Sequence, residues 1–100
     1  MPLMQPQSPK VNRVSVEQDW RARGYSCDLW VDAPGQVWAD FTHPTHELVM
    51  VVEGEVEFEI GGEVHRPAIG EELLIPARVL HTVRNRGRGE SRWLYGYERR

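Results

Sequence analysis

GQVWADFTHPTHELVMVVEG, residues 35–54, carries two side chains of metal-ligand type, His43 and Glu47, on either side of a proline. Pro44 cannot donate to a sheet ladder, so we expect two extended segments to meet here, each turning one of these side chains inward. The bend between the two segments would bring His43 and Glu47 to one place.

A second stretch, GEELLIPARVLHTVRN at residues 70–85, contains a further histidine, His81, after a Pro-containing turn. The segment around His81 is typical of a strand, and its ring supplies a third ligand from a distant part of the chain. The sequence therefore predicts one site that combines His43, Glu47 and His81.

Together, the two stretches resemble the two motifs of the cupin family. The first motif is matched, with correct spacing, at Gly35, His43, Glu47 and Gly54, and Phe41 replaces its first histidine. The second motif is matched at Gly70, Pro76, His81 and Asn85, and Arg78 replaces its inner glycine. The resemblance implies an all-β fold, a double-stranded β-helix or jelly-roll barrel, and many short segments of even spacing agree with it.

The resemblance leaves the function open, because cupins include dioxygenases, isomerases, epimerases, storage proteins and sensor domains. Our first hypothesis is a protein that binds a divalent transition metal and a small organic ligand inside the barrel, as a metal-dependent enzyme of dioxygenase or isomerase type. Glu47 would then be a metal ligand or a catalytic base. The alternative is a non-catalytic, metal-free module that binds or senses a small molecule.

By position in the family motifs, His43, Glu47 and His81 would be the metal ligands, and such a set suits manganese, iron, zinc, nickel or copper. Phe41 removes one of four usual ligands, so we expect weaker affinity unless His46 compensates. His46 would point away on a regular strand, but Pro44 leaves its direction open.

Arg78 stands where the family glycine serves a turn that needs positive φ. Either the turn is redrawn, or Arg78 pairs with a carboxylate or phosphate of a ligand; a solvated surface arginine is the plainer interpretation. Alternation predicts that further lining residues come from four positions, Val37, Val49, Phe58 and Val83. Trp30 and Trp38 would face outward.

The formal net charge of −3 argues against general nucleic-acid binding. The single cysteine, Cys27, favours a reducing cytoplasm, and the longest apolar run, residues 48–52, is too short to span a bilayer. Residues 48–52 are apolar on both faces, and a partner subunit is one candidate for the outer cover. A domain this small gains from such a cover, so we expect a homodimer.

Residues 1–13 carry three prolines and no apolar period, which is typical of a loose arm, and residues 14–100 would form one barrel domain. Ser15 and Gln18 have capping-box spacing, which predicts a short helix over residues 16–23 with Trp20 as its anchor. Alternation over residues 91–98 predicts Trp93, Tyr95 and Tyr97 on one face of a closing strand.

Overall fold

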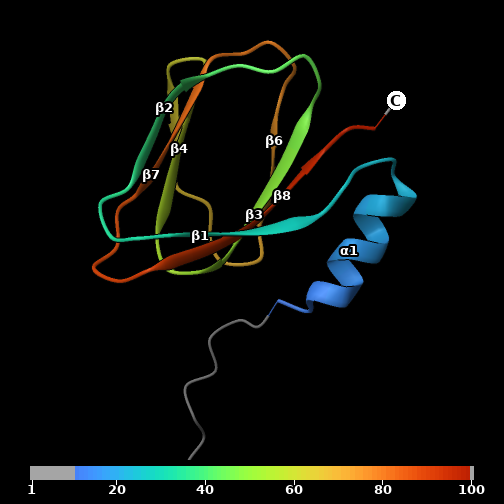
Figure 1. Cartoon of the computed structure of the whole chain (residues 1–100), viewed down its shortest axis with the longest axis horizontal. Helices are drawn as coiled ribbons and strands as arrows, with labels where there is room; N and C mark the ends of the chain where they lie inside the picture. Colours follow the sequence, from blue (N-terminus) through green and yellow to red (C-terminus); the bar gives the residue numbers. More distant parts are fainter. Residues whose placement is uncertain (1–10, 100) are drawn as a thin grey trace, which may run out of the picture.

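Short alternating segments fold into two antiparallel sheets in the computed structural model, which describes residues 11–99 (Figure 1). One sheet has the order β1-β8-β3-β6 and the other β2-β7-β4-β5. In chain order, the strands are β1 (Asp28–Asp32), β2 (Val37–Phe41), β3 (Glu47–Glu53), β4 (Val56–Ile60), β5 (Glu63–His65), β6 (Glu72–Ile75), β7 (His81–Asn85) and β8 (Ser91–Tyr97). This is the jelly-roll barrel that the motifs imply, and the predicted fold class is confirmed.

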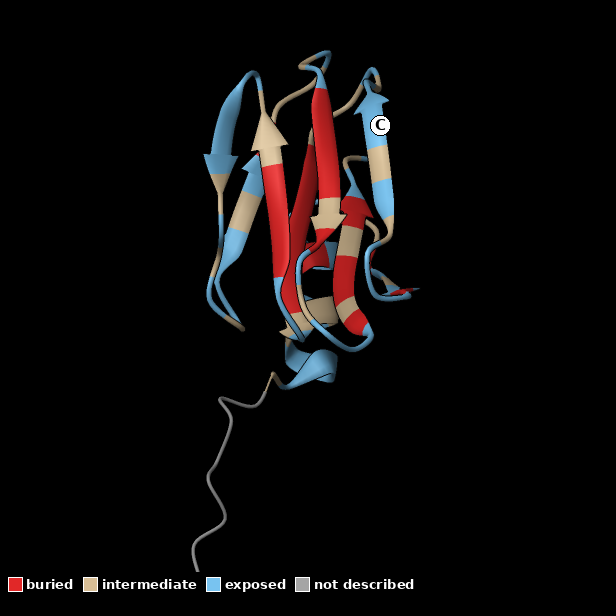
Figure 2. Ribbon diagram, turned by 90° about the vertical axis from the view of Figure 1, so that its left-hand side faces the viewer, coloured by how far each residue is buried: buried red, intermediate tan, exposed pale blue. Residues whose placement is uncertain are grey.

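The central strands of both sheets carry the buried residues, whereas the edge strands are largely exposed (Figure 2). β3 is buried on both faces, as its apolar run predicts. Val49 and Val51 point into the barrel, where they pack with Phe58 and Ile75. The opposite face of β3 therefore needs a cover of its own.

That cover is the helix α1 (Arg13–Ala22), not a partner subunit. Trp20 of α1 is fully buried against Leu48, Met50 and Leu94 on the outer face of the sheet. Gly96 of β8 leaves room for the indole, because a Cβ there would lie 2.9 Å from a Trp20 ring carbon. The prediction of Trp20 as the helix anchor is confirmed.

The helix begins three residues earlier than the capping-box spacing predicts. Asn12, not Ser15, is its N-cap, and the Asn12 side chain accepts a hydrogen bond from the Ser15 N–H. Both residue types cap helices, so the sequence offered two starts and the chain uses the earlier one. Residues 1–10, most of the predicted arm, lie outside the described residues.

β2 contains a register shift against β7 between Trp38 and Phe41, and Asp40 within it has a φ of 60°. Such a bulge breaks the period of two, so Trp38 and Phe41 both line the interior although they are three residues apart. Val37 is instead 48% exposed. The prediction of Val37 inside and Trp38 outside was therefore wrong.

Among residues 11–99, no helix combines the length and the apolar character needed to cross a membrane.

Candidate metal centre and cavity

Three chain segments bring their metal-ligand side chains together at one end of the barrel. Glu47 is the first residue of β3 in one sheet, and His81 is the first residue of β7 in the other. His43 lies in the connection between β2 and β3, where the Arg78 N–H donates to its carbonyl oxygen at 2.8 Å. The site therefore joins both sheets.

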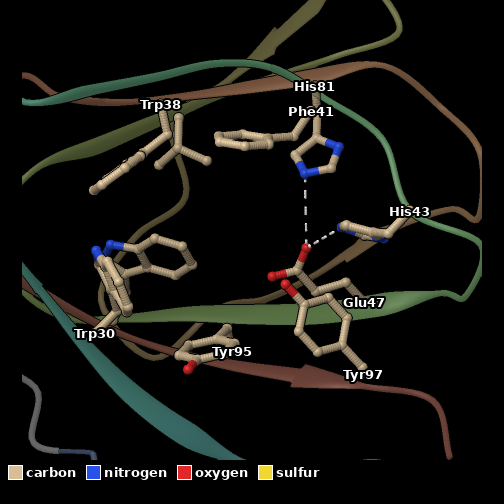
Figure 3. Close-up of a pocket in the computed structure, with 10 residues that line it drawn as sticks. Trp30, Trp38, Phe41, His43, Glu47, His81, Tyr95 and Tyr97 are labelled. Atoms are coloured by element: carbon tan, nitrogen blue, oxygen red, sulfur yellow. Dashed lines mark hydrogen bonds and ion pairs between the residues drawn. The ribbon is translucent and has the colours of Figure 1, made fainter.

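The donor atoms of His43, Glu47 and His81 all lie within 4.8 Å of one another. Nε2 of His43 lies 2.8 Å from Oε1 of Glu47, and Nε2 of His81 lies 3.8 Å from the same oxygen (Figure 3). The structure thus assembles the three residues that the motifs single out. Their role as ligands remains a prediction.

Backbone carbonyls orient both imidazole rings. Nδ1 of His43 lies 3.1 Å from the Thr45 carbonyl oxygen, and Nδ1 of His81 lies 3.1 Å from the Val79 carbonyl oxygen. Because a carbonyl only accepts, each Nδ1 carries the proton, and in a neutral ring the Nε2 lone pair is then directed at Glu47. This is the arrangement in which outer hydrogen bonds prepare histidines to bind a metal.

Burial gives the three side chains unusual acid–base properties. Desolvation raises the pKa of Glu47 to about 7, although the charge and hydrogen bond of His43 act in the opposite direction. Desolvation also lowers the pKa of His81, and it raises the pKa of the neighbouring Tyr97 to about 12. Near neutral pH, Tyr97 is therefore a neutral hydroxyl, and Glu47 is close to the midpoint of its titration.

The donor set fits a divalent transition metal. Two ligands about 2.1 Å from a metal are about 3–4 Å apart, depending on the angle between them. The contact of 3.8 Å to Glu47 lies within that range, the contact of 2.8 Å lies just below it, and no two donor atoms are more than 4.8 Å apart. Two imidazoles and one carboxylate leave further coordination positions open toward the cavity.

A cavity of about 360 Å³ extends from this centre into the barrel, and most of its wall is aromatic. It is lined by Trp30, Trp38, Phe41, His43, Glu47, His81, Val83, Trp93, Tyr95 and Tyr97 (Figure 3). Phe41 and Val83 were predicted to lie here, and the shared face of Trp93, Tyr95 and Tyr97 is confirmed. Val49 and Phe58 belong to the packed core instead.

The sequence interpretation missed Trp30 and Trp38 as part of this wall, and Asp32 as the residue that holds their indoles. Asp32 is only 2% exposed. Its Oδ1 accepts hydrogen bonds from the indole N–H groups of Trp30 at 2.7 Å and Trp38 at 2.8 Å, and its Oδ2 accepts from that of Trp93 at 3.0 Å. The available signal was that Trp30 and Asp32, two residues apart, share a strand face.

The structure also answers the two questions that the sequence left open, the direction of His46 and the role of Arg78. Nδ1 of His46 accepts a hydrogen bond from the Ala77 N–H at 2.9 Å, so this nitrogen is engaged in holding the turn before β7. Arg78 keeps the positive φ of the family glycine, at 66°, and its side chain is exposed. The turn is therefore not redrawn, and Arg78 carries the strain of that conformation.

A family model described as a cupin domain matches residues 28–97. The chain belongs to the cupin family. Among curated proteins, the polyketide synthase CurC of Streptomyces cyaneus is 35% identical over 68 residues, which are 67% of this cupin and 44% of that protein. This cupin thus spans less than half the length of that relative.

Solved structures support the same assignment. The protein TT1209 from Thermus thermophilus is 27% identical, with a TM-score of 0.67, over 76% of this cupin and 74% of that chain. An oxalate oxidase is 26% identical, with a TM-score of 0.66, over 77% of this cupin and 43% of that chain. A salicylate 1,2-dioxygenase from Pseudaminobacter salicylatoxidans, 24% identical with a TM-score of 0.69 over 75% of this cupin and 22% of that chain, shares the fold.

Proposed function

We propose that this cupin binds a divalent transition metal, one of manganese, iron, zinc, nickel or copper, through His43, Glu47 and His81. A small organic ligand would occupy the adjoining cavity and be oxidised or isomerised there. The observation that carries this proposal is the convergence of three donor atoms within 4.8 Å at the end of a cavity of about 360 Å³. The similarity to an oxalate oxidase, at 26% identity, supports a small oxygen-containing ligand.

The side chains of this site have separate tasks in the proposed activity. A bound metal supplies Lewis acidity and open coordination positions. His43 and His81 hold their Nε2 atoms toward the centre because their Nδ1 atoms are fixed by carbonyls. Glu47, with a pKa of about 7, accepts or releases a proton near neutral pH, which suits either a metal ligand or a general base.

Elemental analysis of protein purified without chelator tests the metal, together with His81→Ala. We expect this variant to lose metal content and thermal stability together, because a metal that binds only the folded state adds to its stability. His65→Ala is the matched control, since His65 lies on β5 and pairs with Glu63 at 3.3 Å, away from the site. A wild-type protein that binds none of the five metals when they are offered would end the proposal.

The metal-free binding module remains the alternative, and one observation favours it. The contact of 2.8 Å between His43 and Glu47 already satisfies both groups without a metal. In such a module, His81→Ala would leave a cavity but change no metal content. Ligand binding that is unaffected by chelator would select this alternative.

We also propose that the protein is a homodimer and works in the cytoplasm. The outer face of β3 is covered by α1, so the support for a dimer comes from the small domain and from exposed apolar side chains such as Leu74 and Leu80. The support for the cytoplasm is the free, buried Cys27. Light scattering that gives a monomer mass at micromolar concentration would contradict the dimer.

A further inference from the structure

The aromatic half of the cavity offers ring surfaces and almost no hydrogen-bond donors. An indole has one donor, its N–H, and in Trp30, Trp38 and Trp93 this group is bound to Asp32. The Asp32 carboxylate is buried behind the rings, and within residues 11–99 no cation pairs with it. The three indoles therefore present carbon and π surface to whatever enters.

The rings also stand at steep angles to one another. Trp30 meets Trp38 at an interplanar angle of 78° and Tyr95 at 79°, with ring centroids 5.6 and 6.1 Å apart. The edge-to-face contacts hold the rings of each pair in one orientation. The charge-assisted hydrogen bonds to Asp32 restrict the orientation of the indoles further. Figure 3 shows Trp30 and Trp38 at the far side of the cavity from Glu47 and His43. The walls are therefore set before a ligand arrives.

The carboxylate and the two imidazoles that line the cavity are confined to the opposite end. Among the lining residues, His43, Glu47, His81 and Tyr97 gather there, Tyr95 packs against Trp30, and no lysine or arginine lines the cavity. A ligand that fills both halves must carry its oxygen donors at one end and an uncharged, flat body at the other. An apolar cavity of about 150 Å³ accommodates benzene, so about 360 Å³ has room for a ligand of one or two rings.

We propose that the ligand of this cupin is a planar aromatic compound with a carboxylate or phenolic oxygen at one end, and that Asp32 is the positioning residue for its ring. The oxygen end rests on the metal centre of the proposed function. The choice of an aromatic ring at the other end depends on the indole walls and not on the metal.

Calorimetric titration with two matched probes tests the ring. Salicylate and cis-2-hydroxycyclohexanecarboxylate carry the same two oxygen groups, but only salicylate is flat and aromatic. We expect the zinc-loaded protein to bind salicylate about tenfold or more tightly than the saturated acid, because stacking on the indoles is lost with the flat ring. Equal binding of the two acids overturns the proposal. Tighter binding of choline than of salicylate also overturns it, since the rings would then form a cation cage.

Asp32→Asn tests the positioning role. The amide replaces one carboxylate oxygen by an NH₂ group, which cannot accept from an indole N–H. We expect the preference for salicylate to fall toward that of the saturated acid while zinc affinity stays within about twofold. Asp28→Asn, an exposed carboxylate on the same strand, is the control and should keep the preference. An unchanged preference in Asp32→Asn overturns the positioning role.

A second variant covers the case in which Asp32→Asn does not fold. Trp38→Leu keeps an apolar side chain but removes one aromatic wall, and we expect it to lose the same preference. If wild-type protein binds none of the five metals yet prefers salicylate, the proposed metal function fails and the aromatic site stands. If it binds zinc but shows no preference, the aromatic site fails and the metal function stands.

Discussion

Two glutamates on opposite faces of one sheet have opposite environments. Glu47 of β3 faces the barrel interior, where burial raises its pKa to about 7 and its neighbours are histidines. Glu72 of β6 faces outward, where both of its oxygens accept hydrogen bonds from Arg23 at 2.9 and 2.8 Å. Those bonds, with a third from the Trp20 N–H, hold the pKa of Glu72 below its ordinary value although burial opposes them.

The difference separates stability from chemistry. On the outer face, Trp20 is fully buried, its N–H donates to Glu72, and Glu72 pairs with Arg23. On the inner face, apolar packing fills one part of the barrel, and a cavity is left beside Glu47. A carboxyl kept partly neutral by burial costs stability, and such groups mark functional sites. Changes on the outer face should therefore alter stability without altering metal binding. Changes beside Glu47 should alter metal binding.

Trp20→Ala should have the largest effect on stability. Removing a fully buried indole leaves a cavity and unseats α1, which should lower the free energy of unfolding by about 3–5 kcal/mol in urea titrations. Zinc affinity of the folded protein should stay unchanged, because no Trp20 atom lines the metal centre. Val14→Ala, on the exposed side of α1, is the control. A parallel loss of zinc affinity would show that the two faces are coupled.

Glu47→Gln should stabilise the metal-free protein while abolishing zinc binding. Below pH 4.5, Glu47 is protonated in both the folded and unfolded chains. Between pH 4.5 and about 7, the unfolded chain loses this proton while the folded chain keeps it, so the wild type loses stability relative to the amide variant as pH rises. The gain should reach about 1–3 kcal/mol at pH 7 and vanish near pH 4. A stability difference that is independent of pH would contradict the raised pKa.

Phe41→His should tighten zinc binding by about tenfold, or about 1.4 kcal/mol. Phe41 lies opposite His81 in the β2–β7 register and its ring centroid is 6.4 Å from that of His81, so an imidazole there can join the centre. Val37→His, on the exposed side of the same strand, is the control. A Phe41→His variant that melts at a lower temperature and gains no affinity would count against the three-ligand centre.

Glu72→Gln should have the smallest effect, a loss of about 1 kcal/mol in unfolding free energy at pH 7, because its pair with Arg23 is partly exposed to solvent. The pair stabilises the fold above pH 4.5, and this contribution is lost as pH falls through the lowered pKa of Glu72. The difference from wild type should therefore shrink on acidification, in urea titrations at pH 7 and pH 3. Exposed Glu55→Gln should show no such trend.

The fold was predictable from local pattern wherever a strand keeps the period of two. The face shared by Trp93, Tyr95 and Tyr97 is confirmed, and the hairpin at Gly61 and Gly62 joins β4 to β5 as that pair of glycines predicts. The three candidate ligands came from motif spacing, because the family pattern fixes which strand ends meet. The spacing is kept in this chain although Phe41 stands in place of a family histidine and Arg78 in place of a family glycine.

The errors have two physical causes. The bulge at Asp40 shifts by one residue which side chains of β2 face the barrel interior, and the hydrophobic pattern of the sequence does not predict this bulge. On β1, Trp30 was predicted to face outward, and it lines the cavity instead. Cys27 and Leu29 pack toward α1, while Trp30 and Asp32 face the barrel. An aspartate is usually solvated, and only its three indole partners, from three different strands, make its burial favourable.

All four tryptophans of this chain donate their indole N–H to a carboxylate, Trp20 to Glu72 and the other three to Asp32. These four protons are therefore natural probes for nuclear magnetic resonance, since each exchanges with solvent only when its hydrogen bond opens. The Trp20 signal reports opening of the outer face. The other three report opening between the two sheets, because Asp32 ties Trp30 and Trp93 of one sheet to Trp38 of the other. Hydrogen exchange in one uniformly labelled sample would thus show whether the contact between the two sheets and the contact of α1 with the barrel open together or separately.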